Sequence, residues 1–265
     1  MEPGPDARRT ALITGASSGI GLELARLLAA DGVDLVLVAR SQTRLEQLAQ
    51  TLRGKHGISV LCKPTDLAEP QAPFHLWDDL AAAGLVFDIL VNNAGSGLYG
   101  RLELLDAAAL QNMLQLNVVA LTTLTRLALP GMQSRGWGRI LNVGSVVGYQ
   151  PAGPRMAAYY ASKAYVISFS KGLARELSGS AVSVTCLSPG VTQSSFEERS
   201  GAGGTPLYRL VPKMTAAAVA RAGYAGMKRR STVVIPGLLT KLLSFAGELP
   251  PRRIALEVNR LLLRS

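Results

Sequence analysis

The stretch T-A-L-I-T-G-A-S-S-G-I-G at residues 10–21 decides the fold, because it joins an apolar run of strand length to a glycine-rich turn that opens a helix. Gly15, Gly19 and Gly21 allow a tight turn and let the backbone approach a bound group closely. The start of the helix offers free N–H groups and the positive end of a dipole. These features predict a pyrophosphate site at the first turn; the competing interpretation is a glycine turn needed only for packing.

Apolar runs of strand length recur along the chain and alternate with longer amphipathic stretches. Strands are predicted at 10–14, 34–39, 59–62, 88–93, 139–145, 181–188 and 232–236. Helices are predicted at 23–31, 103–133 and 156–178, and Ser41 can cap a further helix that continues through Leu52. Nearly continuous apolar strands between helices indicate a doubly wound α/β domain over 1–265, with about seven parallel strands covered on both faces. The stretch 201–206 is interpreted as a loop within this domain.

The second predicted strand ends in Ala39-Arg40-Ser41 and carries no acidic residue there. In a dinucleotide site an acid at this point binds the 2′-hydroxyl of the adenosine ribose and repels a 2′-phosphate, whereas an arginine does the reverse. Arg40 therefore favours NADPH, with NADH as the less favoured cofactor. A surface arginine at a strand end is the competing interpretation.

Tyr159 and Lys163 lie four residues apart, in the stretch M-A-A-Y-Y-A-S-K at 156–163. On a helix this spacing puts both side chains on one face. A phenol has a pKa of about 10, and a nearby ammonium group lowers that pKa by favouring the phenolate. The pair can therefore supply a proton near neutral pH, although such pairs are more often solvated surface pairs. Tyr160 lacks the four-residue spacing, so Tyr159 is predicted to be the proton donor.

The net charge of +10 is concentrated in the C-terminal part of the chain. Residues 205–265 carry 11 Lys and Arg against two acids, a balance of +9, and residues 1–204 carry the remaining +1. A basic tail suits an anionic membrane surface, an acidic partner or a phosphate-bearing substrate. The neutral body and the lack of a nucleic-acid motif argue against binding to nucleic acid.

Cys62 and Cys186 each end an alternating apolar run, S-V-L-C and V-S-V-T-C, and are interpreted as buried strand thiols. Two cysteines without a histidine cluster predict neither a metal site nor a disulfide framework, and a reducing cytoplasm follows as the default location. The sequence lacks a charge-free apolar run long enough to span a membrane, and residues 1–9 lack the apolar stretch of a secretory signal.

The chain resembles the short-chain dehydrogenase/reductase family over about residues 8–240, because several motifs occur in the order that this family shows. The motifs are T-G-A-S-S-G-I-G at 14–21, Asp66, N-N-A-G at 92–95, Asn117, Ser145, Tyr159-x-x-x-Lys163 and Pro189-Gly190. The resemblance implies a Rossmann-type fold and an NADP(H)-dependent oxidoreductase.

The resemblance also implies which residues bind the cofactor. Asp66 should bond the adenine amino group with Leu67 beside it, and Asn93 should lie near the adenosine ribose. Either Thr192 or Ser194 should supply the hydroxyl that the family often has after Pro-Gly. The full set is Gly15, Ser17, Ser18, Gly19, Ile20, Gly21, Arg40, Asp66, Leu67, Asn93, Ala94, Gly95, Tyr159, Lys163, Pro189, Gly190, Val191 and Thr192.

Four catalytic residues follow from the same resemblance. Asn117, in mid-helix, should hold a water that relays protons to Lys163. Ser145 should orient the substrate oxygen, and Tyr159 should protonate that oxygen as hydride arrives. Lys163 should lower the pKa of Tyr159 and bond the nicotinamide ribose.

The expected reaction is the reduction of a ketone or aldehyde by NADPH; the alternative is a catalytically silent nucleotide-binding protein. Substrate contacts are predicted from Ser145, Leu98, Tyr149 and Phe196, with Tyr99 and Tyr208 as further candidates. An apolar pocket with aromatic walls suits a lipophilic carbonyl, although each of these residues can also serve ordinary packing.

The tail contains two amphipathic stretches, one with Leu238, Leu239, Leu242 and Leu243 and one that follows Pro250-Pro251. A basic amphipathic end resembles helices that lie on membrane surfaces. It equally resembles a C-terminal helix that docks on its own domain or on a neighbouring subunit. By resemblance, the helices at 103–133 and 156–178 are expected to pair across a two-fold axis, which gives a homodimer or homotetramer.

Overall fold

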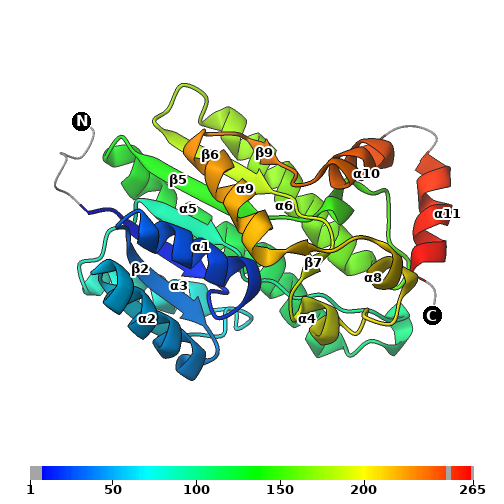
Figure 1. Ribbon diagram of the computed structural model, residues 1–265, viewed down its shortest axis with the longest axis horizontal. Helices are drawn as coiled ribbons and strands as arrows, with labels where there is room; N and C mark the ends of the chain where they lie inside the picture. Colours follow the sequence, from blue (N-terminus) through cyan, green and yellow to red (C-terminus); the bar gives the residue numbers. More distant parts are fainter. Residues whose placement is uncertain (1–7, 249–251, 264–265) are drawn as a thin grey trace.

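The computed structural model describes residues 8–248 and 252–263, and its centre is a parallel sheet of seven strands in the order β3-β2-β1-β4-β5-β6-β9 (Figure 1). The strands are β1 (Thr10–Thr14), β2 (Asp34–Ala39), β3 (Val60–Pro64), β4 (Ile89–Asn92), β5 (Gly138–Val143), β6 (Val182–Leu187) and β9 (Val233–Val234). All seven predicted strands are confirmed, with ends that differ by a few residues. The expected doubly wound α/β fold is also confirmed.

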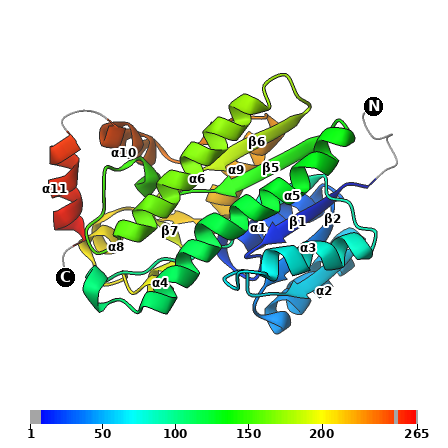
Figure 2. The ribbon, with the colours of Figure 1, turned by 180° about the vertical axis from the view of Figure 1, so that it is seen from behind.

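Three helices cover each face of the sheet. Figure 1 shows α1 (Gly19–Ala30), α2 (Gln42–His56) and α9 (Ala216–Lys228) on the near side. Figure 2 shows α3 (Ala72–Ala82), α5 (Leu121–Ser134) and α6 (Ala157–Glu176) on the other side. Successive strand residues enter opposite cores: Ile13 packs with α1, whereas Leu12 packs with α3 and α5. This double burial explains why the strands are apolar on both faces.

Most predicted helices are present, and Ser41 caps α2 by accepting a hydrogen bond from the Arg44 N–H. The stretch predicted as mainly helical contains α4 (Ala107–Leu114), a π-helical segment η2 (Gln115–Ala120) and α5. The sequence did not predict α3 or α9.

The sheet reverses its direction of growth between β1 and β4, which are neighbours although two strands separate them in the chain. Ligands in open α/β sheets bind outside the carboxyl ends of the strands at such a switch point. Short elements gather there: η1 (Leu102–Leu104), η3 (Val146–Tyr149), β7 (Thr192–Gln193), α7 (Phe196–Ser200), α8 (Pro206–Leu210) and β8 (Met214–Thr215).

The C-terminal helices α10 (Leu238–Glu248) and α11 (Arg252–Leu262) dock on the body of the chain. Gln150 Nε2 donates to the Leu243 carbonyl at 2.7 Å, and Asn259 Nδ2 donates to the Ala152 carbonyl at 2.6 Å. The outer faces nevertheless expose apolar side chains, including those of Leu238, Leu242, Phe245, Ile254, Val258 and Leu261. The expected break at Pro250-Pro251 lies outside the described residues. Within the described ranges, no helix has both the length and the apolar character needed to cross a bilayer.

Candidate active site

The glycine turn between β1 and α1 has the geometry that the sequence predicts. Gly15 and Gly19 adopt positive φ angles of 65° and 57°, which side-chain-bearing residues rarely adopt. A Cβ atom at Gly15 would lie 2.7 Å from Asn93 Nδ2, so this glycine also permits a close approach to β4. Ser18 is the N-cap of α1, but its side chain makes no capping hydrogen bond. The Ser18 side chain thus leaves the first N–H groups of α1 available to a bound group.

Asn93 ties this turn to the end of β4. Its Nδ2 donates to the carbonyls of Thr14 and Gly15, at 2.9 and 3.1 Å, and its backbone N–H donates to Thr14 Oγ1 at 3.0 Å. These hydrogen bonds show that the Asn93 side chain shapes the glycine turn. The expected position of Asn93 beside the adenosine ribose stays a prediction.

A cavity of about 830 Å³ runs along the carboxyl ends of the strands, from the first turn to α10. Most of the residues predicted from the family resemblance line it. They are Gly15, Ser17, Ser18, Gly19, Ile20, Arg40, Asp66, Leu67, Asn93, Ala94, Gly95, Ser145, Tyr159, Lys163, Pro189, Gly190, Val191 and Thr192. Gly21 and Asn117 do not line it, and both act on residues that do. A Cβ atom at Gly21 would overlap the Gly15 carbonyl.

Arginines gather at the end of the cavity beside β2. Arg40 Nη1 lies 3.8 Å from Asp66 Oδ2, and the two side chains are 70% and 41% exposed. Such an exposed pair contributes little stability, at most about 1 kcal/mol. Arg44 of α2 and Arg199 of α7 line the same end, and sequence reasoning missed both.

Tyr159 and Lys163 lie on the buried face of α6, and Ser145 follows β5. Lys163 Nζ donates to the Val143 carbonyl at 3.0 Å and lies 6.0 Å from the centre of the Tyr159 ring. A Cβ atom at Gly95 would come within 3.4 Å of this Nζ atom, so the glycine leaves space beside the ammonium group. Three polar side chains from two segments, α6 and the turn after β5, thus meet at one wall of the cavity.

Burial is the largest influence on the pKa values of Tyr159 and Lys163. It raises the pKa of Tyr159 well above the ordinary value of a phenol, with further raises from Tyr208 and Tyr160, and a hydrogen bond with Ser145 works in the opposite direction. Burial also lowers the pKa of Lys163 to about 8. The residues of the chain by themselves therefore keep the phenol protonated. The expected lowering of the Tyr159 pKa by Lys163 is not found among these residues.

Asn117 is buried in the π-helical segment η2, and its amide is bonded on both sides. Nδ2 donates to the Ser96 carbonyl at 2.9 Å and to Ser162 Oγ at 3.1 Å, and Oδ1 accepts from the Ser96 N–H at 3.0 Å. Ser162 Oγ in turn donates to the Tyr159 carbonyl at 2.7 Å. Asn117 therefore joins the loop after β4 to the helix that carries Tyr159. Single-turn π segments often occur at functional sites.

A buried polar chain that the sequence did not predict supports this helix. Asn92 Nδ2 donates to Thr125 Oγ1 and to Asn142 Oδ1, both at 2.9 Å, and Asn142 Nδ2 donates to Ser170 Oγ at 3.0 Å. These bonds connect β4, β5, α5 and α6 beneath the site. The signal in the sequence was one asparagine, Asn92 or Asn142, in each of two mainly apolar strands.

The two adjacent tyrosines face different surroundings. Tyr159 lines the cavity, and its ring centre lies 5.3 Å from that of Phe196. Tyr160 does not line the cavity and packs so closely on Gly153 that a Cβ atom there would overlap its ring. This difference agrees with the choice of Tyr159 as the proton donor.

Leu98, Phe196 and Tyr208 line the cavity, as expected of substrate contacts, but Tyr149 does not. Tyr149 ends η3 and turns into a core with Leu121, Val166, Ile167 and Cys186. Tyr99 also points away, because its hydroxyl donates to the Leu263 carbonyl at 2.6 Å and so anchors the end of α11. The expected aromatic wall therefore consists of Phe196 and Tyr208.

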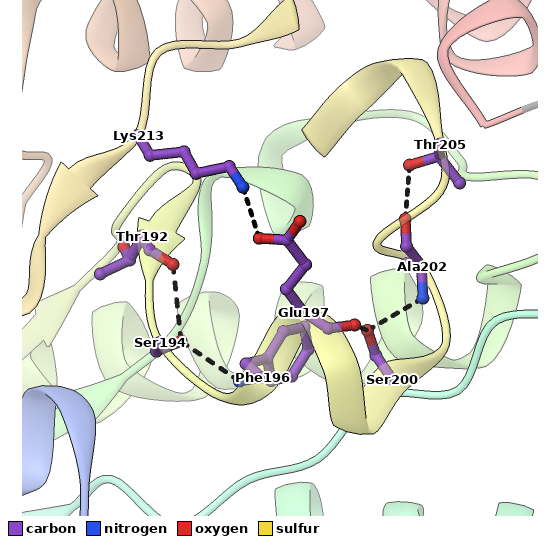
Figure 3. Close-up of polar contacts among 8 residues, drawn as sticks. All are labelled: Thr192, Ser194, Phe196, Glu197, Ser200, Ala202, Thr205 and Lys213. Carbon is purple, nitrogen blue, oxygen red and sulfur yellow. Dashed lines mark hydrogen bonds and ion pairs between the residues drawn. The ribbon is translucent and has the colours of Figure 1, made fainter. Parts of the chain in front are cut away.

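The segment from β7 to α8 covers one side of the cavity, and its own hydrogen bonds give it a fixed shape (Figure 3). Ser194 Oγ donates to the Thr192 carbonyl and accepts from the Phe196 N–H. Lys213 Nζ and Glu197 Oε2 form an ion pair at 2.6 Å that ties α7 to the chain before β8. Thr192 and Ser194 both line the cavity, so the choice between their hydroxyls stays open.

Comparisons with known proteins agree with this geometry. A family model described as short chain dehydrogenase matches residues 9–203. Ketoacyl reductase HetN from Nostoc sp. is 32% identical over 254 residues, which cover 93% of this chain and 86% of that protein. A very-long-chain 3-oxoacyl-CoA reductase from Phaeosphaeria nodorum is 32% identical over 260 residues, which cover 94% of this chain and 75% of that protein.

A solved structure adds a match in three dimensions. A short-chain dehydrogenase from Sphingobium yanoikuyae in complex with NADPH is 36% identical, with a TM-score of 0.80 over 95% of this chain and 93% of that one. The parallel sheet, the glycine turn and the Tyr-Lys pair thus occur in a chain whose relatives are oxidoreductases. The chain belongs to the short-chain dehydrogenase/reductase family.

Proposed function

We propose that the protein reduces a lipophilic ketone or aldehyde to an alcohol with NADPH. The observation that carries this proposal is the meeting of Ser145, Tyr159 and Lys163 at one wall of a cavity whose other end has the glycine turn and Arg40. Glycine positions at the turn and beside Lys163 leave the space that a dinucleotide needs.

The chain's own residues supply the proton and hold the carbonyl group. Bound NADPH supplies a hydride to the carbonyl carbon. Ser145 and Tyr159 donate hydrogen bonds to the carbonyl oxygen as negative charge develops there, and in a buried site one such donor contributes about 10²–10³ in rate. Tyr159 then transfers its proton to this oxygen. Lys163 does not offset the raised pKa of Tyr159 in the chain alone, so its proposed role is confined to the reaction, where the ammonium group, held by the Val143 carbonyl, stabilises the tyrosinate as it forms.

The choice of NADPH rests on Arg40, which lines the cavity at the end of β2. No acidic residue stands at that strand end to bind a ribose 2′-hydroxyl. The Sphingobium yanoikuyae relative, solved with NADPH, supports the same choice.

The proposal of a lipophilic substrate rests on the walls near Tyr159, where Leu98, Met113, Phe196 and Tyr208 line the cavity. Such walls suit an acyl chain or a ring system better than a small polar aldehyde. Two relatives named for ketoacyl and 3-oxoacyl-CoA reduction favour an acyl ketone first.

A carbonyl panel with NADPH tests the proposal. It should contain a 3-oxoacyl thioester, a steroid ketone, a quinone and a short aldehyde, and the loss of NADPH absorbance is followed with each compound. Turnover should be fastest with the lipophilic ketones and about 10²–10⁴ times slower in Tyr159→Phe. Tight NADPH binding without turnover of any member would instead support the catalytically silent alternative.

A further inference from the structure

Three arginine side chains line the same end of the cavity, although they come from distant parts of the chain. Arg40 ends β2, Arg44 lies in the first turn of α2, and Arg199 belongs to α7. Asp66 is close to Arg40, but no described acidic residue forms an ion pair with Arg44 or Arg199. This part of the cavity therefore holds more positive charge than nearby carboxylates balance.

The charges of the three arginines affect one another. Partial burial lowers the pKa of the Arg199 guanidinium, and the neighbouring Arg40 and Arg44 lower that pKa further. An anion bound between them would remove this repulsion and accept charge-assisted hydrogen bonds from planar guanidinium groups. The ligand chemistry that fits is a phosphate.

Helix α7 lies between this cluster and the catalytic tyrosine. The segment before it touches the glycine turn, since a Cβ atom at Gly19 would lie 3.5 Å from Ser194 Cβ. At the start of α7, the Phe196 ring lies 5.3 Å from the Tyr159 ring. Figure 3 shows how the Lys213–Glu197 ion pair and the Ser200 Oγ bond to the Glu197 carbonyl hold α7 in shape. Arg199 and Phe196 therefore belong to the same short helix, and the position of one side chain is linked to that of the other.

We propose that Arg199 binds the 2′-phosphate of NADPH together with Arg40 and Arg44, so that this phosphate fixes α7 and thereby places Phe196 against the substrate. The inference rests on the proposed function and extends it. Arg199 is a cofactor-specificity residue supplied by the segment that covers the substrate. Binding of NADPH then improves binding of the ketone.

Binding without substrate tests the phosphate contact. Dissociation constants for NADPH and NADH are measured by calorimetry for wild type, Arg199→Gln and Arg209→Gln. Arg209 lies in α8 and does not line the cavity, so Arg209→Gln removes the same charge from the same segment without touching the proposed site. Arg199→Gln should weaken NADPH binding about tenfold, the size of one charge-assisted hydrogen bond. NADH binding should be unchanged, and Arg209→Gln should change neither constant.

The outcomes separate the two proposals. If wild type prefers NADPH and Arg199→Gln keeps the full preference, the arginine contact is refuted and the proposed function stands. If Arg199→Gln weakens NADPH and NADH equally, the contact is with the pyrophosphate or the fold, and the 2′-phosphate assignment fails. If wild type binds NADH as tightly as NADPH, the cofactor choice and the Arg199 contact both fail.

Steady-state kinetics test the transmission to Phe196. In wild type the KM for the ketone should be lower with NADPH than with NADH, and in Arg199→Gln it should be the same with both cofactors. Arg199→Lys should restore part of the difference, because the charge returns without the planar fork. A wild-type KM that does not depend on the 2′-phosphate would overturn the transmission.

Discussion

Replacing Lys163 by methionine should abolish reduction and yet leave the protein at least as stable near neutral pH. Burial lowers the pKa of Lys163 from its ordinary 10.5 to about 8, so the folded state resists the charged form. Methionine has a similar length and removes this buried charge. The Val143 carbonyl then loses its donor, which costs about 1–3 kcal/mol.

Proton linkage gives the sign and size of the stability difference between Lys163→Met and wild type. Between about pH 8 and pH 10.5 the unfolded chain keeps a proton on Lys163 that the folded chain has lost, so wild-type stability rises with pH in this window. At about 1.4 kcal/mol for each pH unit, the difference between pH 10.5 and about pH 8 corresponds to about 3.5 kcal/mol. Below about pH 8 wild type carries this whole penalty, and Lys163→Met carries none. Because the unsatisfied Val143 carbonyl costs about 1–3 kcal/mol, the variant should be up to about 2.5 kcal/mol more stable near neutral pH.

Urea unfolding followed by circular dichroism measures the effect from about pH 7 to 10. The advantage of Lys163→Met over wild type should shrink steadily through the window, because other titrating groups are common to both proteins. Lys171→Met, at an exposed position of the same helix, is the matched control for replacing a lysine in α6 and for the loss of the ammonium contact with the Tyr149 ring at 5.0 Å. A stability difference between wild type and Lys163→Met that is constant with pH would refute this account of the buried ammonium group.

Three further predictions address the tyrosines, the cofactor and the tail. Tyr159→Phe should lose about 10²–10⁴ in kcat, whereas Tyr160→Phe should keep most of it, because Tyr160 does not line the cavity; an equal loss in both would reverse the assignment. Arg40→Asp should raise the KM for NADPH about tenfold or more and lower that for NADH, and an unchanged ratio would remove Arg40 from the cofactor site. Contact of the basic tail with lipid stays a prediction, and the apolar side chains that α10 and α11 expose support it. The protein should sediment with phosphatidylserine vesicles at low salt and be released at high salt. Failure to sediment, or equal sedimentation without residues 237–265, counts against this contact.

The sheet was predictable because its strands are apolar on both faces and are separated by turn residues, which is a strong local pattern. Helix α9 was not predictable, because small residues such as alanine and glycine stand where an amphipathic helix usually has large apolar side chains. A Cβ atom at Gly223 would lie 2.6 Å from Leu187, so this helix packs closely on β6 without large side chains. In α3 the proline at its start, Pro73, obscured a helix that it helps to begin.

The candidate catalytic residues could be proposed from the sequence because they occur in the order and spacing typical of the family, with Ser145 after β5 and with Tyr159 and Lys163 one helical turn apart in α6. Residues on short connecting elements could not, since their direction depends on turns that local sequence does not specify. Tyr149 turns into the core at the end of η3, and Arg199 reaches the arginine cluster from a helix of five residues. The pKa of Tyr159 also depends on burial, which spacing to Lys163 does not reveal.

Isotope transfer tests the central claim most directly. NADPH carrying deuterium at both C4 positions is incubated with a lipophilic ketone that the protein reduces, and the alcohol is analysed by mass spectrometry. We predict one deuterium on the carbinol carbon with wild type, and labelled alcohol that forms about 10²–10⁴ times more slowly with Tyr159→Phe. Alcohol that forms without the label, or labelled alcohol at an undiminished rate from Tyr159→Phe, would contradict hydride transfer with Tyr159 as the proton donor.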